Sequence, residues 1–140
     1  MSTAAPALPA STETLALDPA QAWDIFRSGR AELVDVRTGE ERVFVGRVLG
    51  SLHVPWALGP AMLPNPDFVS ELRRLVPPAI PLILLCRSGL RSAAAAQTLL
   101  AGGWHWVATV AHGFEGPLDA HQQRGRLGGW RQSGLPWVQD

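Results

Sequence analysis

The sequence has little of what marks a secreted or membrane-bound protein. Its single cysteine cannot form an internal disulfide, and no signal peptide is visible, because the first basic residue is Arg27 and the start of the chain has no long apolar run. Proline, glycine or a charged residue interrupts every apolar run before it reaches the roughly 18 residues that a membrane helix needs. We therefore expect a soluble, cytoplasmic protein.

An excess of charge of either sign is also missing. Twelve basic and twelve acidic residues give a formal net charge of zero, and the basic residues are spread from Arg27 to Arg131 without a dense run. This distribution argues against a nucleic-acid partner or a membrane surface and leaves small anions as the expected ligands. With 140 residues, of which 46% are hydrophobic, the chain is expected to form one domain with one core.

Regular structure is expected from residue 12 onward. Residues 1–11 are rich in Ala, Pro, Ser and Thr and are predicted to form a flexible N-terminal tail, so the folded domain spans 12–140. Strands and helices alternate through this domain, which predicts an α/β fold with a mostly parallel five-stranded sheet covered on both faces. The expected strands are 12–17, 31–36, 50–54, 82–85 and 106–110, and the expected helices are 18–29, 65–75 and 91–101.

Residues 111–140 are rich in Gly, His, Trp and Pro, and we expect them to close the domain as an irregular C-terminal wrap. One short helical stretch is predicted within the wrap, at 118–123. Aromatic side chains are expected to anchor the wrap by burial, namely Phe114, Trp130 and Trp137.

The single cysteine, Cys86, lies where the apolar run 82–85 gives way to a short polar turn and then to the alanine-rich start of a helix. Its sulfur is expected to face the backbone NH groups of the turn and the positive end of the helix, and Arg87 and Arg91 add two cations. All of these favour the thiolate over the thiol. Cys86 is therefore the candidate nucleophile, because an inert buried cysteine does not need a strand end, a glycine turn and two flanking arginines together.

Three other residues are candidates for a supporting role at the site. Asp35 and Arg37 could be catalytic, but two such residues at the end of a buried strand more often form a structural ion pair, which is the interpretation we favour. Glu40 or Glu41 is a further candidate partner for Arg37. Trp56 follows the end of an expected strand and could border the cysteine pocket.

Three segments of the chain carry a combination of motifs. They read Leu-Val-Asp-Val-Arg at 33–37, Gly-Arg-Val-Leu-Gly-Ser-Leu-His-Val-Pro at 46–55 and Cys-Arg-Ser-Gly-Leu-Arg-Ser at 86–92. Together they resemble the single-domain rhodanese-like sulfurtransferases, and the likeness covers nearly all of the folded part. The resemblance implies a three-layer α/β/α domain and a cysteine that takes a sulfane sulfur from a donor, holds it as a persulfide and passes it to an acceptor.

By this resemblance, Cys86 is the nucleophile and the sulfur carrier, and the loop that follows it binds the substrate. The donor is expected to be a small anion such as thiosulfate, or a protein persulfide, and guanidinium groups suit such anions. A thiol, cyanide or a protein is the expected acceptor, and no cofactor or metal is implied. The backbone NH groups of the loop are expected to cradle the terminal sulfur, and the implied substrate-binding residues are Arg87, Ser88, Gly89, Leu90, Arg91 and Ser92.

Two other functions stay open. One is a persulfide carrier or partner-binding module that delivers sulfur within a protein complex. The other is a phosphatase or an arsenate reductase, enzymes in which five residues separate the cysteine from the arginine so that the loop surrounds a tetrahedral oxyanion. Four residues lie between Cys86 and Arg91, which disfavours this second function.

Two segments depart from the family pattern. Residues 46–48 read Gly-Arg-Val where the family has Gly-His-Ile, and residues 112–113 read His-Gly where the family has a glycine pair.

Overall fold

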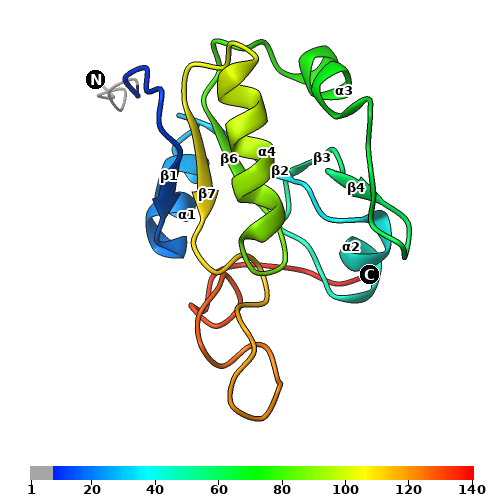
Figure 1. The fold of residues 1–140 in the computed structure, drawn as a ribbon. Helices are drawn as coiled ribbons and strands as arrows, with labels where there is room; N and C mark the ends of the chain where they lie inside the picture. The colour runs from blue at the N-terminus through cyan, green and yellow to red at the C-terminus, as the bar shows by residue number, and fades with distance from the viewer. Residues whose placement is uncertain (1–7) are drawn as a thin grey trace.

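A five-stranded parallel sheet forms the centre of the protein in a computed structural model that describes residues 8–140 (Figure 1). The order across the sheet is β1, β7, β6, β2 and β3, and every neighbouring pair is parallel. The predicted α/β fold is therefore confirmed, and each strand lies within a predicted one. The strands are β1 (Leu15–Leu17), β2 (Glu32–Asp35), β3 (Leu52–His53), β6 (Leu82–Leu85) and β7 (Val107–Val110).

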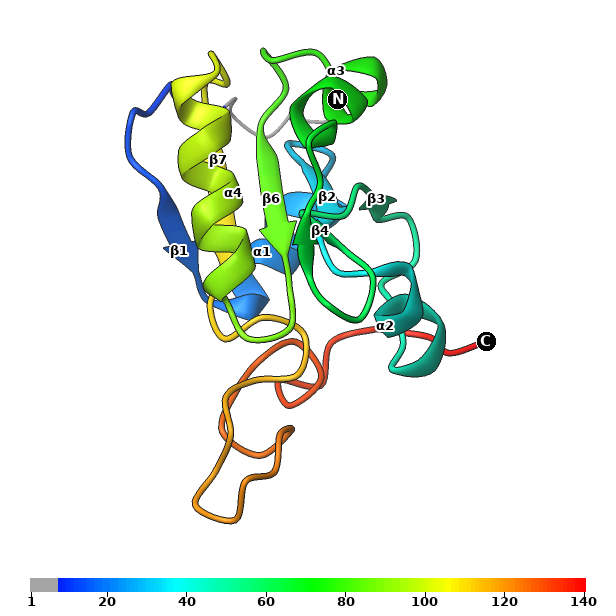
Figure 2. The ribbon, with the colours of Figure 1, turned by 45° about the vertical axis from the view of Figure 1, so that its right-hand side comes forward.

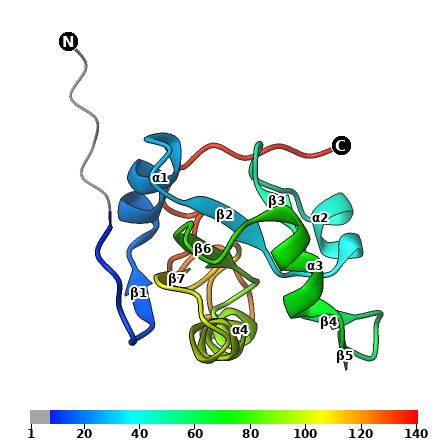
Figure 3. The same ribbon diagram turned by 90° about the horizontal axis from the view of Figure 1, so that it is seen from above.

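Helices cover both faces of this sheet and complete three layers (Figure 3). The period of two along β6 divides its side chains between the layers. Leu82 and Leu84 pack with residues of α3 and α4, whereas Ile83 and Leu85 pack on the other face with Ala22 of α1. No helix within residues 8–140 is long and apolar enough to cross a membrane. The helices named here are α1 (Pro19–Arg27), α3 (Phe68–Leu75) and α4 (Leu90–Ala101).

One helix and one hairpin were absent from the sequence-based prediction. The helix is α2 (Gly39–Phe44), which begins with a capping box. The side chain of Thr38 accepts a hydrogen bond from the Glu41 backbone at 3.3 Å, and the Glu41 carboxylate accepts one from the Thr38 backbone at 3.1 Å. The hairpin consists of β4 (Ala57–Leu58) and β5 (Leu63–Pro64), which pair antiparallel.

The helix predicted from residue 65 begins three residues later, at Phe68. Asn65 forms a turn before it, because its side-chain oxygen accepts a hydrogen bond from the Asp67 backbone at 3.1 Å. The side-chain amide of Asn65 also donates to the Pro55 carbonyl at 2.9 Å, which ties this turn to the chain leaving β3.

The short helix predicted at 118–123 is wrong, because the structure has turns there. The carboxylate of Asp119 accepts hydrogen bonds from the backbone N–H groups of His121 and Gln123 at 2.8 and 3.0 Å. Gln122 between them has a φ of 60°, which is incompatible with a right-handed helix. The local side-chain bonds therefore fold this segment back on itself.

The C-terminal wrap runs below the carboxyl edge of the sheet, and its last residues cross to the segment that precedes β3 (Figure 1), where Arg47 pairs with Val138. Phe114 and Trp130 are fully buried, whereas Trp137 is 37% exposed and packs with its ring perpendicular to that of Phe114. The flexible tail predicted at 1–11 lies mostly outside the described residues. Within its described part, Leu8 packs against the core.

Candidate active site

Cys86 is the first residue after β6 and lies at the carboxyl edge of the parallel sheet. Ligands of open α/β sheets bind at this edge. The loop that follows it reverses direction through Gly89, whose φ of 118° favours glycine, and it enters α4 at Leu90. Figure 2 shows this loop between β6 and α4, directly above the C-terminal wrap. The strand, the glycine and the helix together fix the position of the thiol.

Hydrogen-bond donors from the loop and from the first turn of α4 point at the sulfur of Cys86. The backbone N–H groups of Gly89 and Ser92 donate to the sulfur at 3.1 and 3.4 Å. The hydroxyl of Ser92 lies 3.4 Å from the sulfur, and it is held by its own bond to the Gly89 carbonyl at 3.1 Å. Such N–H dipoles stabilise negative charge on the atom toward which they point.

A pocket of about 300 Å³ opens above Cys86. Trp56, Ala57 and Met62 line part of it, so Trp56 borders the pocket, and its supporting role stays a prediction. Cys86 and the residues that follow it provide the rest of the lining. These residues, apart from Cys86 itself, are Arg87, Ser88, Leu90 and Arg91, whereas Gly89 and the buried Ser92 support the sulfur from outside the lining.

The two arginines of the loop have different surroundings. Arg91 makes a two-pronged ion pair with Glu41 of α2, with N···O distances of 2.6 and 2.8 Å, and both side chains are 16% exposed. The side chain of Arg87 is exposed and has no hydrogen bond or ion pair with any residue from 8 to 140. Among the described residues that line the pocket, Arg87 is therefore the one that offers an unpaired positive charge.

The Glu41–Arg91 pair shifts both of its members toward the charged form. Burial raises the pKa of the Glu41 carboxyl, but the hydrogen bonds from Arg91 and Thr38 outweigh it and leave that pKa below its ordinary value. The hydrogen bond to Glu41 raises the pKa of Arg91 against the opposing effect of burial. The pair is a stable feature of the site at neutral pH.

Asp35 and Arg37 form a closed ion pair at the end of β2 and do not line the cysteine pocket. Both side chains are fully buried, and the guanidinium meets the two carboxylate oxygens at 3.0 and 2.8 Å. Arg37 also donates to the Gly46 carbonyl at 2.7 Å, and Arg42 reaches Asp35 at 3.1 Å. The prediction that Glu40 or Glu41 pairs with Arg37 is therefore wrong, because Glu41 pairs with Arg91 and Glu40 is exposed.

The C-terminal wrap supports the cysteine loop through its backbone, a contact that the sequence analysis missed. The N–H groups of Phe114 and Glu115 donate to the carbonyls of Cys86 and Arg87 at 2.8 and 3.0 Å. Gly113 approaches the same loop so closely that a Cβ there would lie 2.5 Å from the Cys86 carbonyl oxygen. The only sequence signal for this contact is the glycine itself, whose φ is 64°.

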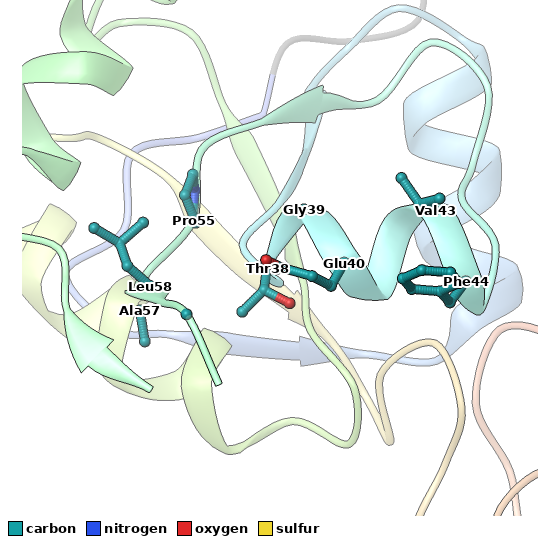
Figure 4. A pocket seen from close by; sticks show the side chains of 9 residues that line it. Thr38, Gly39, Glu40, Val43, Phe44, Pro55, Ala57 and Leu58 are labelled. Atoms are coloured by element: carbon teal, nitrogen blue, oxygen red, sulfur yellow. The ribbon is translucent and has the colours of Figure 1, made fainter. Parts of the chain in front are cut away.

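An apolar groove of about 570 Å³ lies next to the cysteine pocket and shares Ala57 with it. Figure 4 shows α2 along one side of this groove, with Val43 and Phe44 near its end, and Leu58 on the segment opposite. Phe44 is 78% exposed. The surface around the candidate site is therefore more apolar than the formal charges of the loop suggest.

Comparison with known proteins identifies the family. Residues 18–119 match the Rhodanese-like domain, and because this match spans most of the chain, the protein belongs to the rhodanese-like family. The fold is similar to the crystal structure of Rv0390 from M. tuberculosis, with a TM-score of 0.78 and 41% sequence identity over 89% of this chain and 96% of that chain. The predicted family and its three-layer fold are confirmed.

Curated relatives include proteins of known and unknown activity. The chain is 34% identical over 125 residues to an uncharacterized protein of Rickettsia rickettsii, covering 84% of this chain and 91% of the relative. It is 29% identical over 120 residues to the thiosulfate sulfurtransferase GlpE of Actinobacillus succinogenes, covering 86% of each. Sulfurtransferases are thus among the relatives of this chain.

Proposed function

We propose that this protein is a sulfurtransferase, which moves a sulfane sulfur from thiosulfate or a persulfide donor to a thiol or cyanide acceptor through a persulfide on Cys86. The observation that carries the proposal is the pair of N–H donors on the Cys86 sulfur, at 3.1 and 3.4 Å, below an open pocket. Membership of the rhodanese-like family and the sulfurtransferases among the relatives support the same chemistry.

The first step loads the cysteine. The Cys86 thiolate attacks the outer sulfur of thiosulfate, the new S–S bond forms, and the bond between that sulfur and the sulfonate breaks. Sulfite leaves with the bonding electron pair, and the enzyme keeps a persulfide anion. A persulfide donor reacts in the same way and releases a thiolate in place of sulfite. The N–H groups that point at the cysteine sulfur stabilise the negative charge near it.

The second step unloads the cysteine. An acceptor thiolate, or cyanide, attacks the outer sulfur of the Cys86 persulfide, and the S–S bond to the enzyme breaks. The electron pair returns to the Cys86 thiolate, so no external oxidant or reductant is needed. The exposed guanidinium of Arg87 is the charge that draws an anionic donor into the pocket.

Steady-state kinetics with thiosulfate and cyanide test the proposal. The wild-type protein is expected to produce thiocyanate, and Cys86→Ser is expected to lose all turnover, because a serine hydroxyl cannot carry the sulfur as a persulfide. Ser133→Ala is the matched control, because Ser133 lies in the wrap and its hydroxyl bonds only to the Gly129 carbonyl. Turnover that survives in Cys86→Ser would refute the mechanism.

A further inference from the structure

The Glu41 carboxylate occupies the charged end of Arg91. Its two oxygens accept two hydrogen bonds from the guanidinium, at 2.6 and 2.8 Å, in the side-by-side geometry that makes arginine–carboxylate pairs strong. Glu41 is itself fixed, because it belongs to the capping box of α2 and also accepts from the Thr38 hydroxyl at 3.1 Å. Arg91 is therefore held by a carboxylate that is anchored before any substrate arrives.

This pair changes the charge that a donor meets in the pocket. Arg91 and Glu41 cancel, so the exposed Arg87 is the one unpaired cation that the described residues place in the lining. A Cys86 thiolate cancels that charge in turn. Thiosulfate brings two negative charges to this site, whereas the persulfide of an uncharged or zwitterionic molecule brings one. The second charge of thiosulfate finds no free partner there.

The rest of the lining suits a donor that carries carbon. Trp56, Ala57, Met62 and Leu90 present apolar surface to the pocket, and Leu90 is 83% exposed. Apolar groups of a donor gain free energy when they leave water against such surface, and an inorganic dianion has none to bury. Charge and lining thus point to the same class of molecule.

We propose that Glu41 is a specificity-determining residue, which withholds Arg91 from the donor and adapts the pocket to a singly charged organic persulfide in preference to thiosulfate. This inference rests on the sulfurtransferase function proposed above. It predicts that the wild-type protein has a higher kcat/KM with cysteine persulfide, a zwitterion with one additional negative charge, than with thiosulfate. A wild-type preference for thiosulfate would overturn it.

Glu41→Gln tests the role of the carboxylate directly. Glutamine can keep the capping box, but it cannot neutralise Arg91, so a second cation becomes available to the donor. The KM for thiosulfate is expected to fall about tenfold, the size of one added hydrogen bond to a charged group. The KM for cysteine persulfide is expected to change much less. Glu40→Gln is the matched control, because it removes the same charge from the same helix without touching Arg91.

A double variant tests whether the effect passes through Arg91. In Glu41→Gln/Arg91→Gln the released cation is removed, and the gain in thiosulfate affinity is expected to disappear. If Glu41→Gln leaves the KM for thiosulfate unchanged, or lowers the KM of both donors equally, the specificity role is refuted while sulfur transfer by the wild type still stands. If the wild type transfers sulfur from neither donor, the function itself fails.

Discussion

Two neighbouring strands, β2 and β6, end at the same edge of the sheet. Residues at the end of β2 form a buried ion pair, whereas the residue after β6 borders a pocket. At the end of β2, Asp35 and Arg37 are fully buried and bind each other through two hydrogen bonds. At the end of β6, Cys86 receives N–H groups on its sulfur and lines an open pocket. A buried charge that is paired stabilises the fold, whereas the buried Cys86 sulfur, which borders a pocket, is placed where a ligand in that pocket can reach it.

The largest effect on stability is expected at the end of β2, where Asp35 and Arg37 form their buried pair. Arg37→Met keeps most of the side-chain volume but leaves Asp35 without its main partner, so the free energy of unfolding should fall by about 3–5 kcal/mol. Arg27→Met is the control, because its ion pair with Asp24 is 61% and 59% exposed. Chemical denaturation measures both variants. Equal losses would show that the buried pair has no special weight.

The cysteine loop after β6 can be disturbed through the C-terminal wrap without changing the polar groups around the sulfur. Gly113→Ala places a Cβ 2.5 Å from the Cys86 carbonyl oxygen, so the loop must shift and the free energy of unfolding should fall by about 2–4 kcal/mol. Sulfur transfer by the folded protein should fall with it.

Gly134→Ala provides the control for backbone strain. Its φ of 75° is similar to that of Gly113, but a Cβ there meets nothing within 4 Å. It should cost about 1–2 kcal/mol and leave transfer intact. If Gly113→Ala behaves in the same way, the wrap does not support the loop.

A smaller effect is expected when the cysteine pocket loses its unpaired cation, Arg87. Arg87→Gln should raise the KM for thiosulfate about tenfold, because the anion loses one charged hydrogen-bond partner. Arg74→Gln, on the exposed side of α3, is the control for net charge. Initial-rate kinetics at low ionic strength measure the difference. The same KM in both variants would contradict the role of Arg87.

The smallest effect concerns the pair that joins α2 to the cysteine loop. The folded-state pKa of Glu41 lies below its ordinary value of 4.5, so its carboxylate stabilises the fold above that value, and the contribution is lost as the pH falls through the lowered pKa. Glu41→Gln should therefore lower the Tm by a few degrees near pH 7 and by less near pH 3. A difference that does not depend on pH would contradict this pairing.

Most of the sheet could be predicted from the sequence because its signals are local. The run Leu82–Leu85 is apolar throughout, as a strand buried on both faces requires, and it appears in the structure with these bounds. The short elements were missed because their sequences carry no such apolar pattern. α2 has six residues and no buried one, so it carries no apolar periodicity, and only its capping box marks it.

In the candidate site, too, the features set by neighbouring residues could be predicted, and those set by long-range contacts could not. Cys86 and the loop after it are contiguous, so their position between a strand and a helix follows from the order of residues. The partner of Arg91 does not, because Glu41 lies 50 residues away and no spacing rule connects the two. The support from Gly113 also depends on tertiary contacts. Long-range pairing, rather than the motif, decides which arginine remains free.

Intact-protein mass spectrometry after exposure to a sulfane sulfur donor tests the central claim most directly. The wild-type protein should gain the mass of one sulfur atom and lose it on treatment with cyanide or a reductant, and Cys86→Ser should gain nothing. A wild-type protein that acquires no sulfur, or a Cys86→Ser variant that acquires as much, would contradict the account.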